Sequence, residues 1–281
     1  MFFLSKYNFN EHSLNIKIKA AIETFAKLGS FKYSDSDDQA NFDINSCKIF
    51  QFENGSYYIG QWKYGMKHGK GKQIWQDGSF YEGFWENNMA TGRGRLIHAD
   101  GDYYEGYWKE DKAYGKGIYN HINGAKYEGD WMDDKQHGFG EESWPDGARY
   151  TGEYKEGKKN GKGVFKWADS SQFEGDFIEN AIEGNGVYLW SDGRRYDGDW
   201  KKNKMSGKGE FTWPDGRKYV GEYYDDKKEG NGVFEWPDGR RYKGEWKNGK
   251  QHGRGLYRTT AGEEKEGEWN EGKRSKWIEK E

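Results

Sequence analysis

The chain has 281 residues, of which 33% are hydrophobic, 18% aromatic and 33% charged, with a formal net charge of −3. The low hydrophobic content disfavours a globular domain built on one closed apolar core, and the small net charge disfavours nucleic acid as a partner. The single cysteine, Cys47, excludes an intramolecular disulfide. No apolar run approaches about 18 residues, so no membrane-spanning helix is predicted. A single cysteine fits a reducing compartment, so we expect an intracellular protein.

Residues 1–30 are predicted to form an N-terminal segment. It contains a short amphipathic helix over residues 14–28, with Ser13 as candidate N-cap and Gly29 as the stop. Four apolar residues at helical spacing form one stripe and are candidates for binding a partner: Leu14, Ile18, Ile22 and Phe25. The helix could cap the sheet that follows, fill its trough, or dock on another protein.

The next stretch, residues 31–46, is acidic and polar and predicts a flexible linker. Residues 47–273 then form a repeat array, and residues 274–281 are a C-terminal tail. Phe52 stands in the register of Trp75, which makes residues 47–55 a half-hairpin that starts the sheet.

A period of 23 residues dominates the array. Glycine recurs between two aromatic positions at a constant step: Gly60, Gly83, Gly106, Gly129, Gly152, Gly175, Gly198, Gly221, Gly244 and Gly267. Within one unit Tyr58, Gly60 and Trp62 alternate with polar or aliphatic residues and share one face of a strand. A second strand starts at each Gly-x-Gly, and an Asp-Gly turn such as that at Gly78 closes one end. The polar segment before Gly-x-Gly, as in "KYGMKHG", predicts a longer connection.

The architecture expected from this period is all-β: about ten hairpins in an elongated, single-layer antiparallel meander, a solenoid-like rod. The aromatic face is its core. A single layer buries so many rings only if it curls or if something lies in the trough, so we expect part of this face to meet a partner. The alternative is that twist and ring stacking suffice.

Segments resembling "YEGEW", followed by "GKG" at a 23-residue period, are similar to the membrane occupation and recognition nexus, or MORN, repeat over roughly residues 51–273. Local departures are Ser170 at a turn glycine, His98 and His121 at later tryptophan positions, and a degenerate last unit around Ala261. The resemblance implies a stand-alone scaffold like those of radial-spoke heads, cilia and the cytoskeleton. Its best-known alternative role is a peripheral membrane adaptor for acidic phospholipids.

Motifs for chemistry are not found. His68, His137 and His252 occupy one equivalent position that we interpret as an exposed turn, and "GKKNGKG" lacks the spacing of a phosphate loop. No Ser/His/Asp or Cys/His arrangement can be built, so we expect no enzyme, no cofactor and no metal site.

The charge is unevenly distributed. Residues 79–143 carry 13 acidic and 7 basic residues, a net charge of −6, whereas residues 192–255 carry 12 and 16, a net charge of +4. Six basic residues after equivalent turns form a candidate edge for acidic lipid or an acidic partner: Arg194, Arg195, Arg217, Lys218, Arg240 and Arg241. The leading hypothesis is a non-enzymatic scaffold for other proteins, of the cilium or the cytoskeleton, with a homodimer as a further option.

Overall fold

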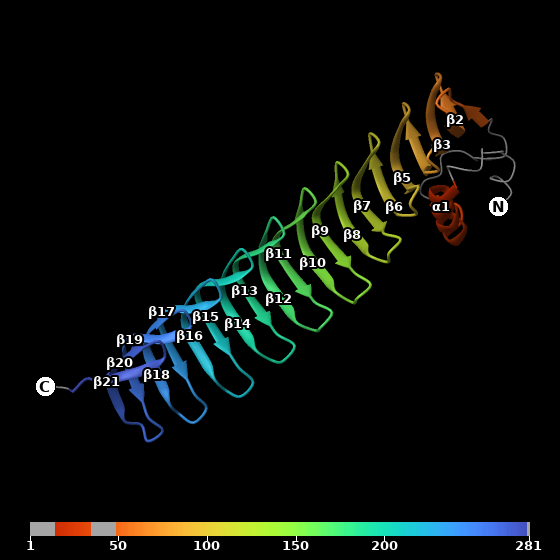
Figure 1. Ribbon diagram of the computed structural model, residues 1–281. Coiled ribbons are helices and arrows are strands. Elements are labelled where there is room, and N and C mark those ends of the chain that lie inside the picture. The colour runs from red at the N-terminus through yellow and green to blue at the C-terminus, as the bar shows by residue number, and fades with distance from the viewer. Residues whose placement is uncertain (1–14, 35–48, 280–281) are drawn as a thin grey trace. The chain divides into compact units, whose positions relative to one another are not determined.

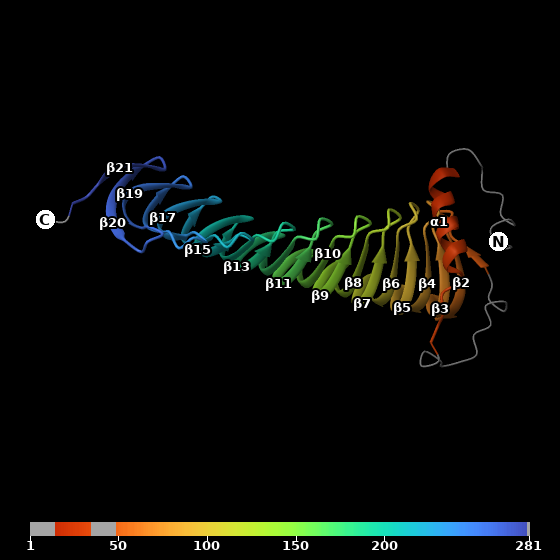
Figure 2. The same ribbon diagram turned by 90° about the horizontal axis from the view of Figure 1, so that it is seen from below.

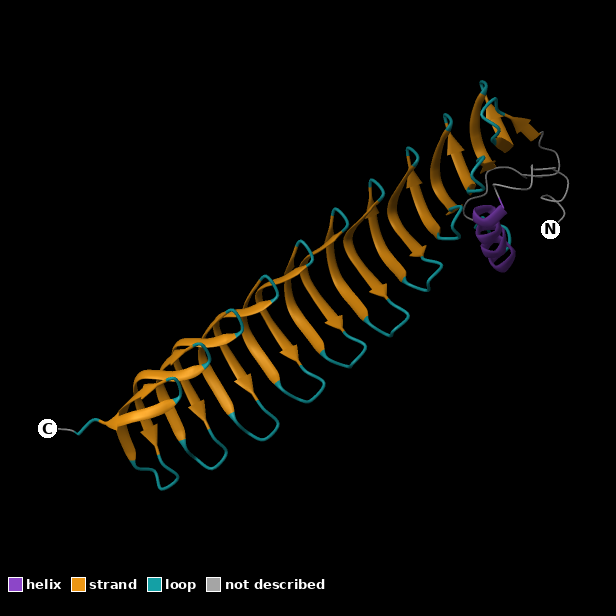
Figure 3. Cartoon of the chain, viewed as in Figure 1, coloured by secondary structure: helices purple, strands orange, loops and turns teal. Residues whose placement is uncertain are grey.

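The computed structural model describes residues 15–34 and 49–279, and within them it contains one helix and 21 strands (Figure 3). The helix, α1, covers Asn15–Leu28, and the strands are antiparallel and belong to one sheet. The predicted fold class, an antiparallel meander of hairpin repeats with one N-terminal helix, is confirmed. The residues divide into two compact units, described separately: residues 1–145 with 154–157, and residues 146–153 with 158–281.

In the first unit each strand pairs with the next along the chain (Figure 1). Its strands are β1 (Ile49–Gln51), β2 (Tyr57–Lys63), β3 (Met66–Ile74), β4 (Phe80–Glu86), β5 (Met89–Ile97), β6 (Tyr103–Lys109), β7 (Lys112–Asn120), β8 (Lys126–Met132) and β9 (Lys135–Ser143). The expected half-hairpin is present as β1.

The second unit repeats the same pattern from β11 onward. Its strands are β11 (Lys158–Lys166), β12 (Gln172–Ile178), β13 (Ala181–Leu189), β14 (Arg195–Lys201), β15 (Lys204–Thr212), β16 (Lys218–Tyr224), β17 (Lys227–Glu235), β18 (Arg241–Lys247), β19 (Lys250–Arg258), β20 (Glu264–Asn270) and β21 (Lys273–Trp277); β10 (Arg149–Lys155) has residues in both units. The expected tail over residues 274–281 is corrected, since β21 extends to Trp277.

Each hairpin closes at a two-residue turn in which both residues have positive φ. Tyr64 (52°) and Gly65 (76°) join β2 to β3, and Lys202 (50°) and Asn203 (65°) join β14 to β15. Two left-handed residues in succession give a type I′ turn, whose twist matches that of the strands. The longer connection expected ahead of each Gly-x-Gly is therefore wrong, because the polar segment belongs to the second strand.

The second turn residue also ties its hairpin to the preceding one, in a contact we call the tip bridge. Asp111 donates its backbone N–H to the carbonyl of Ala90 (3.1 Å), and the N–H of Ala90 donates to Asp111 Oδ1 (2.6 Å). Asn203 and Ile182 repeat this pair at 3.0 and 2.7 Å. Where the turn residue is Gly249, its N–H still donates to the carbonyl of Lys228 (2.9 Å). Neighbouring hairpins are thus joined at their tips.

The predicted Asp-Gly turns close the other end of the hairpins. Gly78 has a φ of 91° and donates its N–H to the carbonyl of Trp75 (3.1 Å), while Ser79 N–H donates to Asp77 Oδ1 (3.0 Å). Ser170 adopts the same left-handed conformation, with a φ of 71°, where other repeats have glycine.

The core of each unit is a ladder of rings over paired glycines. A Cβ on Gly83 would lie 2.4 Å from the Tyr81 hydroxyl and 2.5 Å from Gly94 Cα, so the phenol occupies the space that two absent side chains leave. The Tyr81 ring packs edge-on against Trp85 of its own repeat and Trp108 of the next, with centroids 5.0 and 5.1 Å apart. Such edge-to-face pairs are favourable beyond their buried area.

The same tyrosine or phenylalanine is buried in every complete repeat: Tyr58, Tyr81, Tyr104, Tyr127, Tyr150, Phe173, Tyr196, Tyr219 and Tyr242. None of the nine is more than 2% exposed. The chain therefore buries these rings by its own ring stacking, and they need no partner in the trough.

Candidate interaction surfaces

The segment from α1 to Ser34, which we call the docked segment, packs on β3, β4 and β5 of the first unit and on the turn after β5 (Figure 2). The Phe25 ring meets Phe80 edge-on with centroids 5.1 Å apart, and Lys72 Nζ lies 4.9 Å from the centre of the Phe25 ring. Gly29 ends α1 as predicted, because its φ is 71° and its N–H donates to the carbonyl of Phe25 (2.8 Å).

Residues beyond the helix complete the contact. Phe31 is 4% exposed, and its N–H donates to Glu82 Oε2 at 3.0 Å. The Tyr33 ring meets Phe84 edge-on with centroids 5.1 Å apart, and burial, followed by the nearby Glu82, raises the pKa of Tyr33. The predicted linker over residues 31–46 is thus corrected at its start, because residues 31–34 are packed on the sheet; residues 35–46 lie outside the described residues.

The docked segment lies on the face opposite the ring ladder. Phe80, Glu82 and Phe84 alternate along β4 with Tyr81 and Trp85, which belong to the core. We call the face that carries Phe80 the outer face. The helix therefore docks within its own chain, and it does so outside the trough.

The predicted helical stripe is only partly described. Phe25 contacts Phe80, whereas Ile22 is 37% exposed. Leu14 lies outside the described residues, and Ile18 lies in α1 without a described side chain. Partner binding by this stripe stays a prediction.

Charged groups lie beneath the docked segment, and they are paired. Glu82 is 4% exposed and Arg95 is 6% exposed. Lys72 Nζ lies 3.3 Å from Glu82 Oε1, and Arg95 Nε lies 2.8 Å from Glu105 Oε2. Arg95 also donates from Nη1 to the carbonyl of Gly29 (2.8 Å), so the segment itself supplies part of the pairing that buried charges require.

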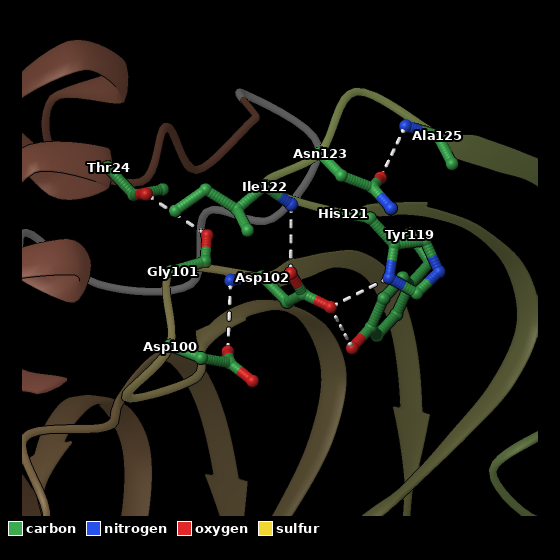
Figure 4. A network of polar contacts seen from close by, with 9 residues as sticks. All are labelled: Thr24, Asp100, Gly101, Asp102, Tyr119, His121, Ile122, Asn123 and Ala125. Atoms are coloured by element: carbon green, nitrogen blue, oxygen red, sulfur yellow. Dashed lines mark hydrogen bonds and ion pairs between the residues drawn. The ribbon is translucent and has the colours of Figure 1, made fainter. Parts of the chain in front are cut away.

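A polar network anchors α1 at the turn between β5 and β6 (Figure 4). Thr24 donates its hydroxyl to the carbonyl of Gly101 (3.0 Å). Next to it, Asp102 binds the following turn through His121 Nδ1 (2.8 Å), the Ile122 N–H (2.8 Å) and the Tyr119 hydroxyl (3.1 Å). Burial would raise the pKa of Asp102, but these hydrogen bonds outweigh it and hold the pKa below its usual range. Sequence reasoning missed this network, since it depends on residues that break the repeat.

In the second unit a lysine is held among aromatic rings. Lys228 Nζ lies 4.5 Å from the ring centre of Phe234, 4.8 Å from Trp246, 5.0 Å from Tyr219 and 5.1 Å from Trp213. Burial, followed by the nearby charge of Arg217, lowers the pKa of Lys228 to about 8. Cation–π attraction offsets part of the desolvation of this ammonium group. The lysine belongs to the core side of β17.

The six predicted edge residues all form ion pairs. Their partners and distances are Arg194–Asp192 (2.7 Å), Arg195–Asp197 (2.7 Å), Arg217–Asp215 (2.8 Å), Lys218–Glu210 (2.7 Å), Arg240–Asp238 (2.7 Å) and Arg241–Glu235 (3.3 Å). Exposed pairs of this kind add little stability. However, each acidic partner neutralises the positive charge beside it. The edge therefore attracts an acidic ligand much less strongly than six unpaired basic side chains would.

The histidines are placed differently from the prediction. His68, His137 and His252 lie within β3, β9 and β19 and are half-buried, not in exposed turns. Across residues 15–34 and 49–279 no group of three or more His, Cys, Asp or Glu side chains is arranged to hold a metal ion. The helix in the described part of the chain is too short and too polar to cross a bilayer.

Comparison with solved structures gives weak likenesses. The TCP10 domain of Danio rerio CPAP, in complex with a peptide of Danio rerio STIL, is 11% identical with a TM-score of 0.42, covering 84% of this chain and 100% of that one. The SAS-4 (dCPAP) TCP domain of Drosophila melanogaster, with a proline-rich motif of Ana2 (dSTIL), is 10% identical with a TM-score of 0.36, covering 69% and 98%. Such low scores transfer neither function nor partners to this chain. Comparison with curated proteins gives no match.

The repeat itself identifies the family. The MORN repeat matches residues 58–80, 81–103, 104–126, 127–149, 150–172, 173–194, 196–216, 219–240 and 242–263. At most two residues separate one match from the next. The degenerate unit around Gly267 lies outside them although it still forms a hairpin. With nine repeats in register with the observed hairpins, the chain belongs to the MORN repeat family.

Proposed function

We propose that this protein is a non-enzymatic scaffold that binds and spaces other proteins. MORN repeats indicate a repeat scaffold or interaction module. The observation that carries the proposal is the division of roles within each hairpin. The ring positions are buried, and the ring and glycine positions recur in every complete repeat, whereas one outer-face position changes from Phe80 to Lys126 to Gln172. A constant frame with variable outward side chains suits the recognition of several partners.

The finer proposal is a place in the cilium, in a radial-spoke-head-like complex of the axoneme, or in the cytoskeleton. Its support is the resemblance to stand-alone MORN scaffolds. Proximity labelling in ciliated cells, with a biotin ligase fused to the C-terminus, tests it. Enrichment of axonemal or cytoskeletal proteins over a freely diffusing ligase supports the proposal, and labelling no different from that control contradicts it.

A peripheral membrane adaptor is the second candidate, and the six basic edge residues favour it. Their ion pairs weaken that support. Pelleting with phosphatidylserine-containing vesicles at physiological salt separates the two roles. A membrane role requires binding that is lost when the six are changed to glutamine; no binding, or binding that the change leaves intact, removes it. A homodimer is a further proposal, tested by sedimentation velocity.

A further inference from the structure

Two strands of the first unit share a pattern on the outer face. β4 carries Phe80, Glu82 and Phe84 at alternate positions, and β6 carries Tyr103, Glu105 and Tyr107. The sequence aromatic-x-Glu-x-aromatic occurs on no other first strand of a hairpin. At the three equivalent positions, for example, β2 has Tyr, Ile and Gln, β8 has Lys, Glu and Asp, and β16 has Lys, Val and Glu. We call the two sets the β4 subsite and the β6 subsite.

The β4 subsite is filled by the docked segment. Phe80 meets Phe25, Glu82 accepts the Phe31 N–H, and Phe84 meets Tyr33. Two further groups finish it: the Tyr33 hydroxyl donates to the carbonyl of Gly83 (3.3 Å), and Lys70 Nζ lies 4.9 Å from the centre of the Tyr33 ring. The aromatic ring, carboxylate, carbonyl and ammonium group of this subsite thus recognise a tyrosine and the backbone N–H two residues before it. The Phe31 ring itself contacts Arg93 and Arg95 of β5.

The β6 subsite has the equivalent groups one repeat further along, and its two cations, Arg93 and Arg95, already contact the Phe31 ring of the docked segment. Arg93 pairs in register with Tyr107, as Lys70 does with Phe84, and Arg95 pairs with Glu105, as Lys72 does with Glu82. The carbonyl of Gly106 corresponds to that of Gly83. Tyr107 is 49% exposed, and the Glu105 side chain is 34% exposed.

The rest of the array shows why an aromatic residue at position 107 is unusual. Seven repeats have a carboxylate there: Asp130, Glu153, Asp176, Asp199, Glu222, Glu245 and Glu268. In six of them it accepts a backbone N–H from the bulged second strand, as Asp176 does from Asn185 (3.1 Å) and Asp199 from Lys208 (2.8 Å). Gln61 does the same with its amide oxygen (2.8 Å from the Lys70 N). An aromatic ring supplies no such acceptor.

Phe84 cannot accept the hydrogen bond from the second strand, and its ring contacts Tyr33 instead. Tyr107 forgoes this hydrogen bond too, and among the described residues no ring of the docked segment meets it. Aromatic residues and arginine are enriched in protein interfaces, so the exposed Tyr107 beside Arg93 and Arg95 is typical of a residue that contacts a second protein.

We propose that the β6 subsite binds an extended, tyrosine-containing segment of a protein partner, lying beside the docked segment. The partner's tyrosine ring stacks on Tyr107, its hydroxyl donates to the carbonyl of Gly106, and a backbone N–H two residues earlier donates to Glu105. The proposal rests on the scaffold function and names the chemistry of one partner.

The test is a titration of the full chain against a fluorescein-labelled peptide of residues 29–35, GSFKYSD, followed by anisotropy. The site variant is Tyr107→Asp, which restores the carboxylate present in seven other repeats and so is expected to fold. The matched control is Tyr64→Asn, since Tyr64 is 88% exposed and the equivalent turn residue of the next repeat is Asn87. A third variant, Phe84→Asp, removes the β4 subsite.

We expect the parent and Tyr64→Asn to bind the peptide alike, and Tyr107→Asp to bind at least about tenfold more weakly with an unchanged melting temperature. A peptide with alanine in place of tyrosine should bind as weakly. Absence of binding by the parent overturns the proposal. The proposal is also overturned if Phe84→Asp loses peptide binding while Tyr107→Asp keeps it. That result would mean that the peptide displaces the docked segment from the β4 subsite.

Sedimentation velocity of the parent and Tyr107→Asp without peptide tests the competing occupant. A dimer that only the parent forms assigns the β6 subsite to a second copy and overturns the proposal, and a monomer in both agrees with it. Failure of this proposal can be distinguished from failure of the scaffold function. If the Tyr107→Asp chain no longer binds the peptide but still labels partner proteins by proximity, the scaffold function stands.

Discussion

Trp85 donates its indole N–H to the carbonyl of Gly71, 3.1 Å away and 14 residues earlier in the chain. The same bond joins Trp108 to Gly94, Trp131 to Gly117, Trp200 to Gly186 and Trp246 to Gly232. The indole therefore holds the second strand of one hairpin to the first strand of the next, while its ring packs on the tyrosine ladder.

Replacement of Trp246 by phenylalanine should lower the free energy of unfolding by about 1–2 kcal/mol, because a buried carbonyl loses its donor. Chemical denaturation in urea measures the change. The control is Tyr223→Phe at the equivalent position, where the buried hydroxyl has no hydrogen-bond partner, so its removal should be neutral or stabilising. Equal losses in the two variants would contradict the role of the indole bond.

Gly83→Ala should be strongly destabilising, by about 3 kcal/mol, because the new methyl group would overlap both the Tyr81 phenol and the backbone of Gly94. Thermal unfolding followed by circular dichroism measures the loss. Gly157→Asn is the control, since Gly157 has a φ of 81° with nothing within 4 Å of an added Cβ, and Asn180 stands at the equivalent turn. We expect that control to shift stability by no more than about 0.5 kcal/mol. A tolerated Gly83→Ala would disprove close packing over the paired glycines.

Lys228→Met should change how stability depends on pH. The pKa of Lys228 is lowered from 10.5 to about 8 in the folded protein, so between these values the unfolded chain binds more protons and the stability of the parent rises with pH. Relative to Lys228→Met, the free energy of unfolding of the parent should therefore rise from pH 8 to pH 10.5. Below pH 8 the burial of the charged lysine should lower the free energy of unfolding of the parent by its full amount. Methionine is compatible with the site, because Met205 occupies it in another repeat.

Urea titrations at pH 7, 8.5 and 10 provide that comparison, and the tyrosines that titrate at high pH cancel between the two proteins. Lys243→Met, at an exposed lysine of the neighbouring strand, is the control for removal of one positive charge. A parent-minus-variant difference that is flat across this range would contradict the buried position of the ammonium group.

Phe31→Ala should loosen the docked segment while the sheet stays folded. Phe31 is almost fully buried, and loss of its ring removes contacts with Tyr33 and with the guanidinium groups of Arg93 and Arg95. Hydrogen–deuterium exchange should become faster in α1 and unchanged in β12–β19. Ile22→Ser, at a residue already 37% exposed, should leave exchange in α1 close to that of the parent. Unaltered exchange in Phe31→Ala would show that the helix alone holds the segment.

The features that depend on the repeat period could be predicted from the sequence. The 23-residue step placed the paired glycines, the rings beside them and the left-handed glycine of turns such as that at Gly78. The end of α1 followed from Gly29. These predictions succeeded because each rests on a local steric requirement that recurs in copy after copy.

Structural features that depend on residues departing from the repeat, or on contacts between neighbouring hairpins, could not be predicted from the sequence. The tight turns were missed because residues such as Glu110 and Asp111 carry no glycine to signal a positive φ. The site of the docked segment was missed because it is defined by Phe84, Arg95 and Gly101, which come together only when two hairpins are side by side. The ion pairs at the basic edge were also missed, because a count of charges along the sequence does not show which acidic and basic side chains lie next to each other.

The tip bridges set a rule for changes in chain length. Asp111 and Asn203 both reach back 21 residues to a strand with the same register, so each contact is defined by its offset along the chain and not by its absolute position. Duplication or loss of a whole 23-residue unit inside the array recreates every such contact, whereas an insertion of any other length breaks a bridge and misplaces a ring. The number of copies can therefore evolve in integer steps, and the reach of the protein with it.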